Sequence, residues 1–220
     1  MKLKRSLYYI LMYLPLLTTI IALPFLPDQI PAHYGSDGQI TRWGSKFETL
    51  ILPVFIILFG LFMLGMAKIS AKQEVAGKNN EKVTIVTGIL CLALFNAMTG
   101  YFLYTDFHKV ENLGSVAVAP TQMIFGILGI FMMIVGNIMP KVKKNSVIGV
   151  RTPWSMKNEI TWKKSQRFGG ISFIISGVII LLVNFLTEAN TCLIVSLIVL
   201  VIGACMDVLY SYQIAKRNEI

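Results

Sequence analysis

Long apolar runs dominate this chain and decide what it can fold into. Six stretches of about 18 residues or more are mostly apolar, and each is long enough to cross about 30 Å of hydrocarbon as a helix. Charged residues make up 14% of the sequence, whereas about 25% is usual in a soluble domain. The sequence therefore predicts an all-α integral membrane protein with six transmembrane helices, at about 6–26, 49–68, 83–104, 116–139, 168–187 and 191–212.

The distribution of Lys and Arg predicts how these helices are oriented. All of these cations except Arg42, Lys46 and Lys109 lie in the N-terminus, in the loops near 68–82 and 140–168, or in the C-terminal tail. Short cytoplasmic loops carry such an excess of positive charge. We therefore expect both termini to be cytoplasmic. The first apolar run is longer than the core of a signal peptide and lacks a small-residue cleavage site, so we expect an uncleaved helix.

The loop at 27–48 is expected to face outward and to be ordered. Its GSDG sequence at 35–38 is strong turn chemistry, and the flanking segments 32–34 and 39–42 can pair as a small hairpin. Trp43 fits an interfacial anchor before the second helix.

The cytoplasmic loop at 140–168 is the longest polar stretch and is strongly basic. Thr152 and Pro153 fit an N-cap followed by proline at the first helical position, which predicts an interfacial helix from about 153 that continues into the fifth span. In that helix Met156 and Ile160 would share a face, and Trp154 and Trp162 would lie at headgroup depth. Two interpretations remain open, a topology signal that binds anionic lipids and a docking surface for an acidic cytoplasmic partner.

Four polar residues fall inside the predicted helices, where polar groups are costly. An interhelical hydrogen bond is the plain interpretation, and a path for a ligand or ion is the alternative. Asp207 would lie near the cytoplasmic end of the sixth helix, where Arg151 or Arg167 could pair with it. The four residues are Asn96, Asn137, Asn184 and Asp207.

Several chemistries are disfavoured by the residues present. The two histidines, His33 and His108, stand at unrelated positions, so we expect no metal site, and we expect no other cofactor. Motifs for a metalloprotease or a serine hydrolase are absent from the sequence, so an enzyme is not expected. The net charge of +9 lies in loops and termini, where topology and lipid headgroups explain it without direct nucleic-acid binding.

Two stretches resemble known families. The first, LPDQIPAHYGSDGQITRWGSK at 26–46, is similar to the DUF1648 region through Pro27, Ile30, Pro31, His33, Gly38, Trp43, Gly44 and Lys46. The second, IGVRTPWSMKNEITWKKSQRFGG at 148–170, resembles the SdpI family motif. Its matching residues are Gly149, Arg151, Thr152, Pro153, Trp154, Asn158, Glu159, Trp162, Phe168, Gly169 and Gly170. We therefore expect a DUF1648-like region at 1–68 and an SdpI-like region at 69–220.

The resemblance implies a function in the cell membrane of a Gram-positive bacterium. SdpI-type proteins are immunity factors against a secreted, membrane-active peptide toxin, and toxin engagement can lead them to hold a cytoplasmic ArsR-type repressor. On that basis we expect His33, Asp37, Trp43 and Lys46 to face the toxin. We expect the motif residues from Gly149 to Trp162 to hold a soluble partner. A small-molecule or ion transporter and a regulatory membrane subunit without a toxin are the alternatives.

Overall fold

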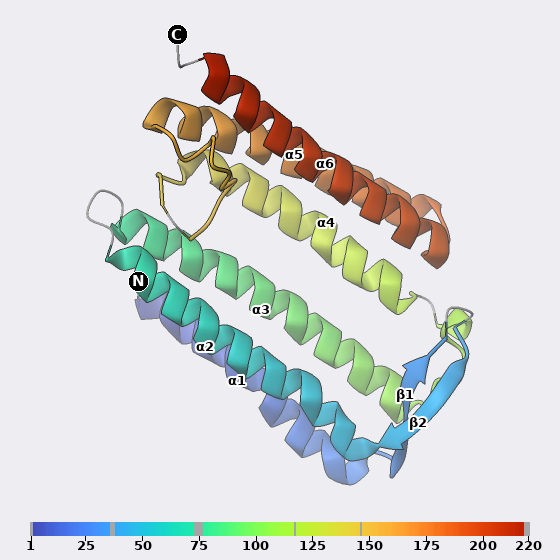
Figure 1. The fold of residues 1–220 in the computed structure, drawn as a ribbon. Helices are drawn as coiled ribbons and strands as arrows, with labels where there is room; N and C mark the ends of the chain where they lie inside the picture. The colour runs from blue at the N-terminus through green and yellow to red at the C-terminus, as the bar shows by residue number, and fades with distance from the viewer. Residues whose placement is uncertain (1, 36–37, 73–76, 117, 146, 218–220) are drawn as a thin grey trace. The chain divides into compact units, whose positions relative to one another are not determined.

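The computed structural model describes residues 2–35, 38–72, 77–116, 118–145 and 147–217. Six long helices in this part of the chain are apolar enough to cross a membrane, as the sequence predicts (Figure 1). The protein is a multi-pass membrane protein. The helices are α1 (Lys2–Ala22), α2 (Ile51–Ala71), α3 (Gly77–Phe107), α4 (Pro120–Ile138), α5 (Glu159–Leu186) and α6 (Ala189–Arg217).

Short elements connect these helices. Strands β1 (Gln29–Tyr34) and β2 (Ile40–Ser45) lie between α1 and α2, flanked by the 3-10 turns η1 (Leu23–Phe25) and η2 (Lys46–Leu50). The turn η3 (Leu113–Ser115) precedes α4, and η4 (Met139–Lys141) follows it.

The outer faces of the helices are apolar, as contact with lipid requires. Phe185 is 82% exposed and Ile21 is 60% exposed, and similar side chains recur along every long helix. A soluble protein rarely tolerates contiguous apolar surface of this extent. In a bilayer the same surface is solvated by lipid chains.

Contacts within the chain define two compact units. The first unit comprises 1–62 and 88–124, and the second comprises 63–87 and 125–220. Helices α2 and α3 each contribute one part to each unit.

The first unit packs α1 against the neighbouring parts of α2 and α3. The Tyr8 hydroxyl donates to the Gly60 carbonyl at 2.8 Å, and Asn96 Nδ2 donates to the Leu11 carbonyl at 2.7 Å. A Cβ atom at Gly88 would lie 2.7 Å from the Tyr8 ring, so only glycine admits this ring against α3. The sequence expectation of an interhelical hydrogen bond therefore holds for Asn96.

The second unit holds α4, α5 and α6 together through small residues. A Cβ atom at Gly136 would lie 2.5 Å from the Gly170 carbonyl oxygen, and one at Gly177 would lie 2.5 Å from the Gly129 carbonyl oxygen. Glycine at these positions lets the backbones of α4 and α5 approach closely, which is how van der Waals contact drives association within a bilayer.

The helix bounds differ from the predicted ones where polar residues continue a helix. Helix α3 begins at Gly77 rather than at about 83, and α6 extends to Arg217 rather than to about 212. Helix α4 begins at Pro120 rather than at 116, since proline at the first helical position gives up only a donor that would be unpaired there. Hydropathy marks the apolar core of a span, whereas capping and local hydrogen bonds decide where it ends.

Candidate functional site

The hairpin of β1 and β2 forms one candidate site in the first unit. The strands pair antiparallel from Gln29 opposite Ser45 to Tyr34 opposite Ile40, and the register shifts on either side of His33. Gly38 has a φ of +77°, a conformation that favours glycine, and its N–H donates to the Gly35 carbonyl at 3.0 Å. The strands are longer than the short segments that the sequence suggested.

The hairpin lies beside the end of α3 (Figure 1), and hydrogen bonds fix it to the loop that follows this helix. The Tyr34 hydroxyl donates to the Val110 carbonyl at 2.7 Å, and Leu113 N donates to the Gly38 carbonyl at 2.9 Å. Burial raises the pKa of Tyr34 to about 12, so this phenol remains a donor at any physiological pH. These bonds hold the hairpin and the loop after α3 together as one ordered structure.

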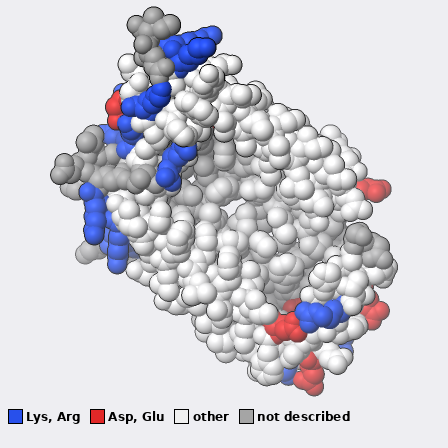
Figure 2. Space-filling view, in the orientation of Figure 1, with Lys and Arg blue, Asp and Glu red and all other residues white. Residues whose placement is uncertain are grey.

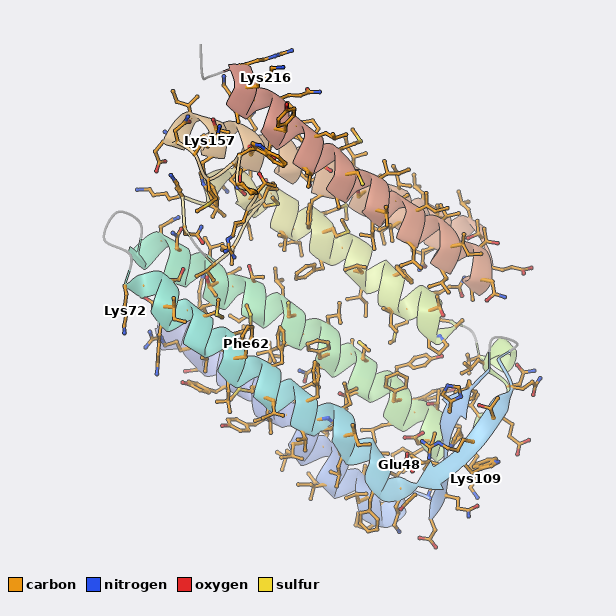
Figure 3. All side chains as sticks on the ribbon, viewed as in Figure 1. Glu48, Phe62, Lys72, Lys109, Lys157 and Lys216 are labelled. Carbon is orange, nitrogen blue, oxygen red and sulfur yellow. The ribbon has the colours of Figure 1, made fainter. Side chains whose placement is uncertain are left out.

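Ion pairs hold the base of the hairpin. Arg42 donates to both carboxylate oxygens of Glu48 at 3.0 and 2.7 Å, and Figure 3 labels Glu48, which lies in η2 just before α2. Lys46 donates to Asp28 at 2.8 Å, and this hydrogen bond holds the pKa of Asp28 below its usual value. Ser45 and Glu48 form a capping box that begins η2.

A cavity of about 490 Å³ lies between the hairpin, the start of α2 and the end of α3. Apolar side chains form most of its wall. Asp106, which is 5% exposed, is the buried acid in that wall. The lining residues are Ile30, Pro31, Ala32, Tyr34, Arg42, Glu48, Thr49, Ile51, Leu52, Phe55, Thr99, Phe102, Leu103, Thr105 and Asp106.

Among the described residues expected to face a toxin, His33 and Trp43 lie on the hairpin and Lys46 begins η2, and none of the three lines this cavity. His33 contacts the Thr41 hydroxyl through Nδ1, Trp43 is 42% exposed, and Lys46 pairs with Asp28. Asp37 lies outside the described residues. Sequence reasoning did not place Asp106, Leu52 and the aromatic wall in one site, because α2 and α3 bring them together from distant positions. An acid at the last turn of an apolar helix was the available signal.

The basic segment 140–168 forms a second candidate site, in the second unit. The predicted interfacial helix from 153 is wrong. The Thr152 hydroxyl accepts from Ser155 N at 3.0 Å and the Ser155 hydroxyl accepts from Thr152 N at 2.9 Å, which closes a turn over 152–157. Helix α5 begins at Glu159, where Asn158 Oδ1 accepts from Thr161 N at 2.8 Å as the N-cap.

Trp162 is a core residue and not an interfacial one. It is fully buried, its Nε1 donates to the Val142 carbonyl at 2.8 Å, and it packs with Val83 and Val142. Met156 contacts this cluster, whereas Ile160 is 57% exposed, so the expected shared face is also wrong. The two residues sit on different elements, a turn and a helix.

Two amides that sequence reasoning missed hold the segment in place. Asn145 Oδ1 accepts from Val147 N and Ile148 N at 2.7 and 2.8 Å. Gln166 on α5 bonds to both the N–H and the carbonyl of Val150. Gly149 has a φ of +109°, which explains why the motif has glycine there. Most motif residues therefore stabilise the fold of the basic segment.

The exposed part of this segment is basic. Figure 2 shows Lys and Arg side chains gathered near the start of α5 and the C-terminal end of α6. Arg151 donates to the Val147 carbonyl at 3.3 Å, and Glu159 and Pro153 are also exposed. Trp154 packs edge-on against Tyr212 with ring centroids 5.2 Å apart. The exposed cations of 140–168 are Lys141, Lys143, Arg151, Lys157, Lys163, Lys164 and Arg167.

The remaining intramembrane polar residues also lie in the second unit. Asn184 Nδ2 contacts Cys192 Sγ at 3.7 Å, and Asn137 is exposed beside a groove between α4 and α5. Asp207 accepts a hydrogen bond from Ser172 and faces Gly169, and within the described residues no ion pair joins it to Arg151 or Arg167. The α5–α6 interface leaves room for it because its neighbours there are small.

Comparison with known proteins finds two family models that each match part of the chain. Residues 141–211 match the SdpI/YfhL protein family, and residues 10–57 match a domain of unknown function, DUF1648. The chain is thus similar to the SdpI/YfhL family over its basic segment, α5 and most of α6. It is 27% identical over 216 residues to the immunity protein SdpI of Bacillus subtilis (strain 168), which covers 97% of each chain. No solved structure matches this chain.

Proposed function

We propose that this protein is a non-enzymatic membrane immunity protein that protects a bacterium against a secreted, membrane-active peptide. The proposal is supported by the similarity to an immunity protein along nearly the whole chain. In this proposal both termini are cytoplasmic and the hairpin faces outward, where a secreted peptide arrives.

The main structural support for this proposal is the cavity beneath the hairpin, where we expect the peptide to bind. Its wall is mostly apolar, and the hairpin that covers it is held by Tyr34 and by the Arg42–Glu48 pair. A peptide that disorders bilayers must present large apolar side chains. Burying them is favourable by about 25 cal/mol per Å² of apolar surface. The cavity offers that burial at the membrane surface and so competes with insertion of the peptide into lipid.

An assay of survival tests this function. A sensitive host that lacks its own immunity gene would express this chain and be exposed to the sibling-killing peptide. We expect Thr99→Phe on α3 and Leu52→Trp on α2 to lose protection, since both fill the cavity. Leu61→Phe is the matched control, because Leu61 is 50% exposed on α2 and does not line the cavity. Full protection by both filled variants, at equal membrane levels, would remove the cavity from the proposal.

The basic segment supports a second, cytoplasmic activity. We propose that Arg151, Lys157 and their exposed neighbours hold an acidic soluble partner such as an ArsR-type repressor. When no partner is bound, the headgroups of anionic lipids would neutralise these cations. Peptide binding would alter this hold only if the peptide prefers one of two states of the protein. A fluorescent repressor should move to the membrane when peptide is added to wild-type cells, and Arg151→Glu with Lys157→Glu should prevent it. Unchanged recruitment in the double variant would exclude the segment.

The rival functions have less support. A transporter needs polar groups along its path, yet the amide nitrogen of Asn96 donates to the Leu11 and Leu92 carbonyls at 2.7 Å. In a regulatory subunit that binds no toxin, the basic segment would still bind a partner, but the cavity would have no ligand.

A further inference from the structure

We infer that the cavity beneath the hairpin recognises a positively charged group attached to an apolar chain, and that the Asp106 carboxylate is its partner. This inference rests on the proposed peptide-binding function and specifies its ligand. A lysine side chain, an arginine side chain or a free peptide N-terminus, flanked by large apolar residues, has the required chemistry.

The hydrogen bonds of the cavity wall account for its other polar groups. The Tyr34 hydroxyl donates to Val110 and Arg42 is held by Glu48. The three threonine hydroxyls of the wall each donate to a backbone carbonyl, from Thr49 to Lys46, from Thr99 to Phe95 and from Thr105 to Phe102. These groups have no need of a ligand.

Asp106 is different. It is 5% exposed, and among the described residues neither an ion pair nor a hydrogen bond reaches its carboxylate. Lys109 bonds to Asp106 only through backbone atoms, its N–H donating to the Asp106 carbonyl at 3.3 Å, and its side chain is exposed. A buried charge without a partner is costly, so natural proteins pair it or use it.

The surroundings of Asp106 specify the rest of the ligand. Phe55, Phe102 and Leu103 line the same cavity, so a cation there must carry apolar groups close to its charge. A small hydrated cation would leave these side chains in contact with water. An anionic or neutral apolar chain would leave the carboxylate without a partner.

Small probes test the recognition directly. The full chain in lipid nanodiscs would be titrated by calorimetry with hexylamine, and with hexanol as the neutral probe of similar size, against empty nanodiscs. We expect saturable hexylamine binding that weakens about tenfold or more in Asp106→Asn, because a charge-assisted bond is lost. Hexanol should not distinguish the two proteins. Glu111→Gln is the control, since Glu111 is an exposed acid in the same unit that does not line the cavity.

The unfolding temperature and the survival assay separate this inference from the proposed function. Asp106→Asn should unfold at an equal or higher temperature, whereas a lower one would reveal a structural partner and overturn the inference. Equal hexylamine affinity in wild type and Asp106→Asn would also overturn it. If Thr99→Phe abolishes protection while Asp106→Asn keeps it, the cation site is wrong and the immunity site stands. If hexylamine binds through Asp106 but Thr99→Phe still protects, the immunity site is wrong and the cation site stands.

Discussion

Gln166 holds Val150 by both of its backbone groups. The side-chain oxygen accepts from Val150 N at 3.0 Å, and the side-chain nitrogen donates to the Val150 carbonyl at 2.9 Å. Gln166 is fully buried on α5, so these two bonds join the basic segment to the helix in a place that water does not reach.

Replacing this amide by an apolar group of similar size should loosen the segment. In Gln166→Leu the Val150 carbonyl keeps a bond from the Ser155 hydroxyl, but the N–H loses its partner. An unsatisfied buried donor costs about 1–3 kcal/mol. Unfolding by SDS in mixed micelles should show a loss of that order, and Lys163→Leu on the exposed face of α5 should show little. Equal stability of the two variants would contradict the role of Gln166.

Gly149 should not tolerate even alanine. Its φ of +109° disfavours any side chain, and a Cβ atom there would lie 2.5 Å from Gln166 Oε1. We expect Gly149→Ala to lower the free energy of unfolding by about 1–3 kcal/mol. Gly65→Ala is the opposite case, because no heavy atom lies within 4 Å of its Cβ position in α2. It should raise the helix stability by about 0.5–1 kcal/mol, and the same SDS titration compares the two.

Trp162 should contribute to the free energy of unfolding through both the hydrogen bond of its ring nitrogen and the volume of its side chain. Trp162→Phe removes the bond to the Val142 carbonyl and should cost about 1 kcal/mol. Trp162→Ala also opens a cavity and should cost about 3–5 kcal/mol. Trp154→Phe is the control, because Trp154 is only half-buried against Tyr212. A loss in that control as large as in Trp162→Phe would argue against the bond.

The sequence predicted the six spans because hydropathy over about 20 residues is a property of the local chain. It also predicted the hairpin, since the turn residues lie within one loop. It could not predict that Trp162 is buried, because an amphipathic aromatic suits either a headgroup layer or a core. The choice depends on Val83 and Val142, which are distant in sequence.

The start of α5 shows how local chemistry misled the prediction. Thr152 followed by Pro153 has the pattern of a helix start, yet Ser155 and Ser211 both bond to the Thr152 side chain and stabilise a turn. Asn158 then supplies the actual cap. The cavity at the hairpin could not be predicted for another reason. Asp106 of α3 lines it together with Arg42 of β2 and Glu48 of η2, and only the packing of the chain brings these elements together.

The pair of Lys46 and Asp28 gives a prediction about pH. Lys46 Nζ lies 2.8 Å from Asp28 Oδ1, and this bond lowers the pKa of the carboxyl. An acid whose pKa is lowered by folding contributes stability above its ordinary pKa of about 3.9, and loses it as the pH falls through the lowered value. Because the Asp28 side chain is 93% exposed, solvent screens the pair and we expect the change in its titration rather than in overall stability.

Carbon-13 NMR of the Asp28 carboxyl measures this directly. Lys46→Gln should return the pKa of Asp28 toward its ordinary value, so that protonation begins at a higher pH than in the wild type. Lys109→Gln removes another exposed cation from the same unit and should leave the titration unchanged. Superimposable titration curves for wild type and Lys46→Gln would mean that the pair does not persist at the hairpin base. In that case the strands would be held by their backbone bonds and by Arg42 with Glu48 alone.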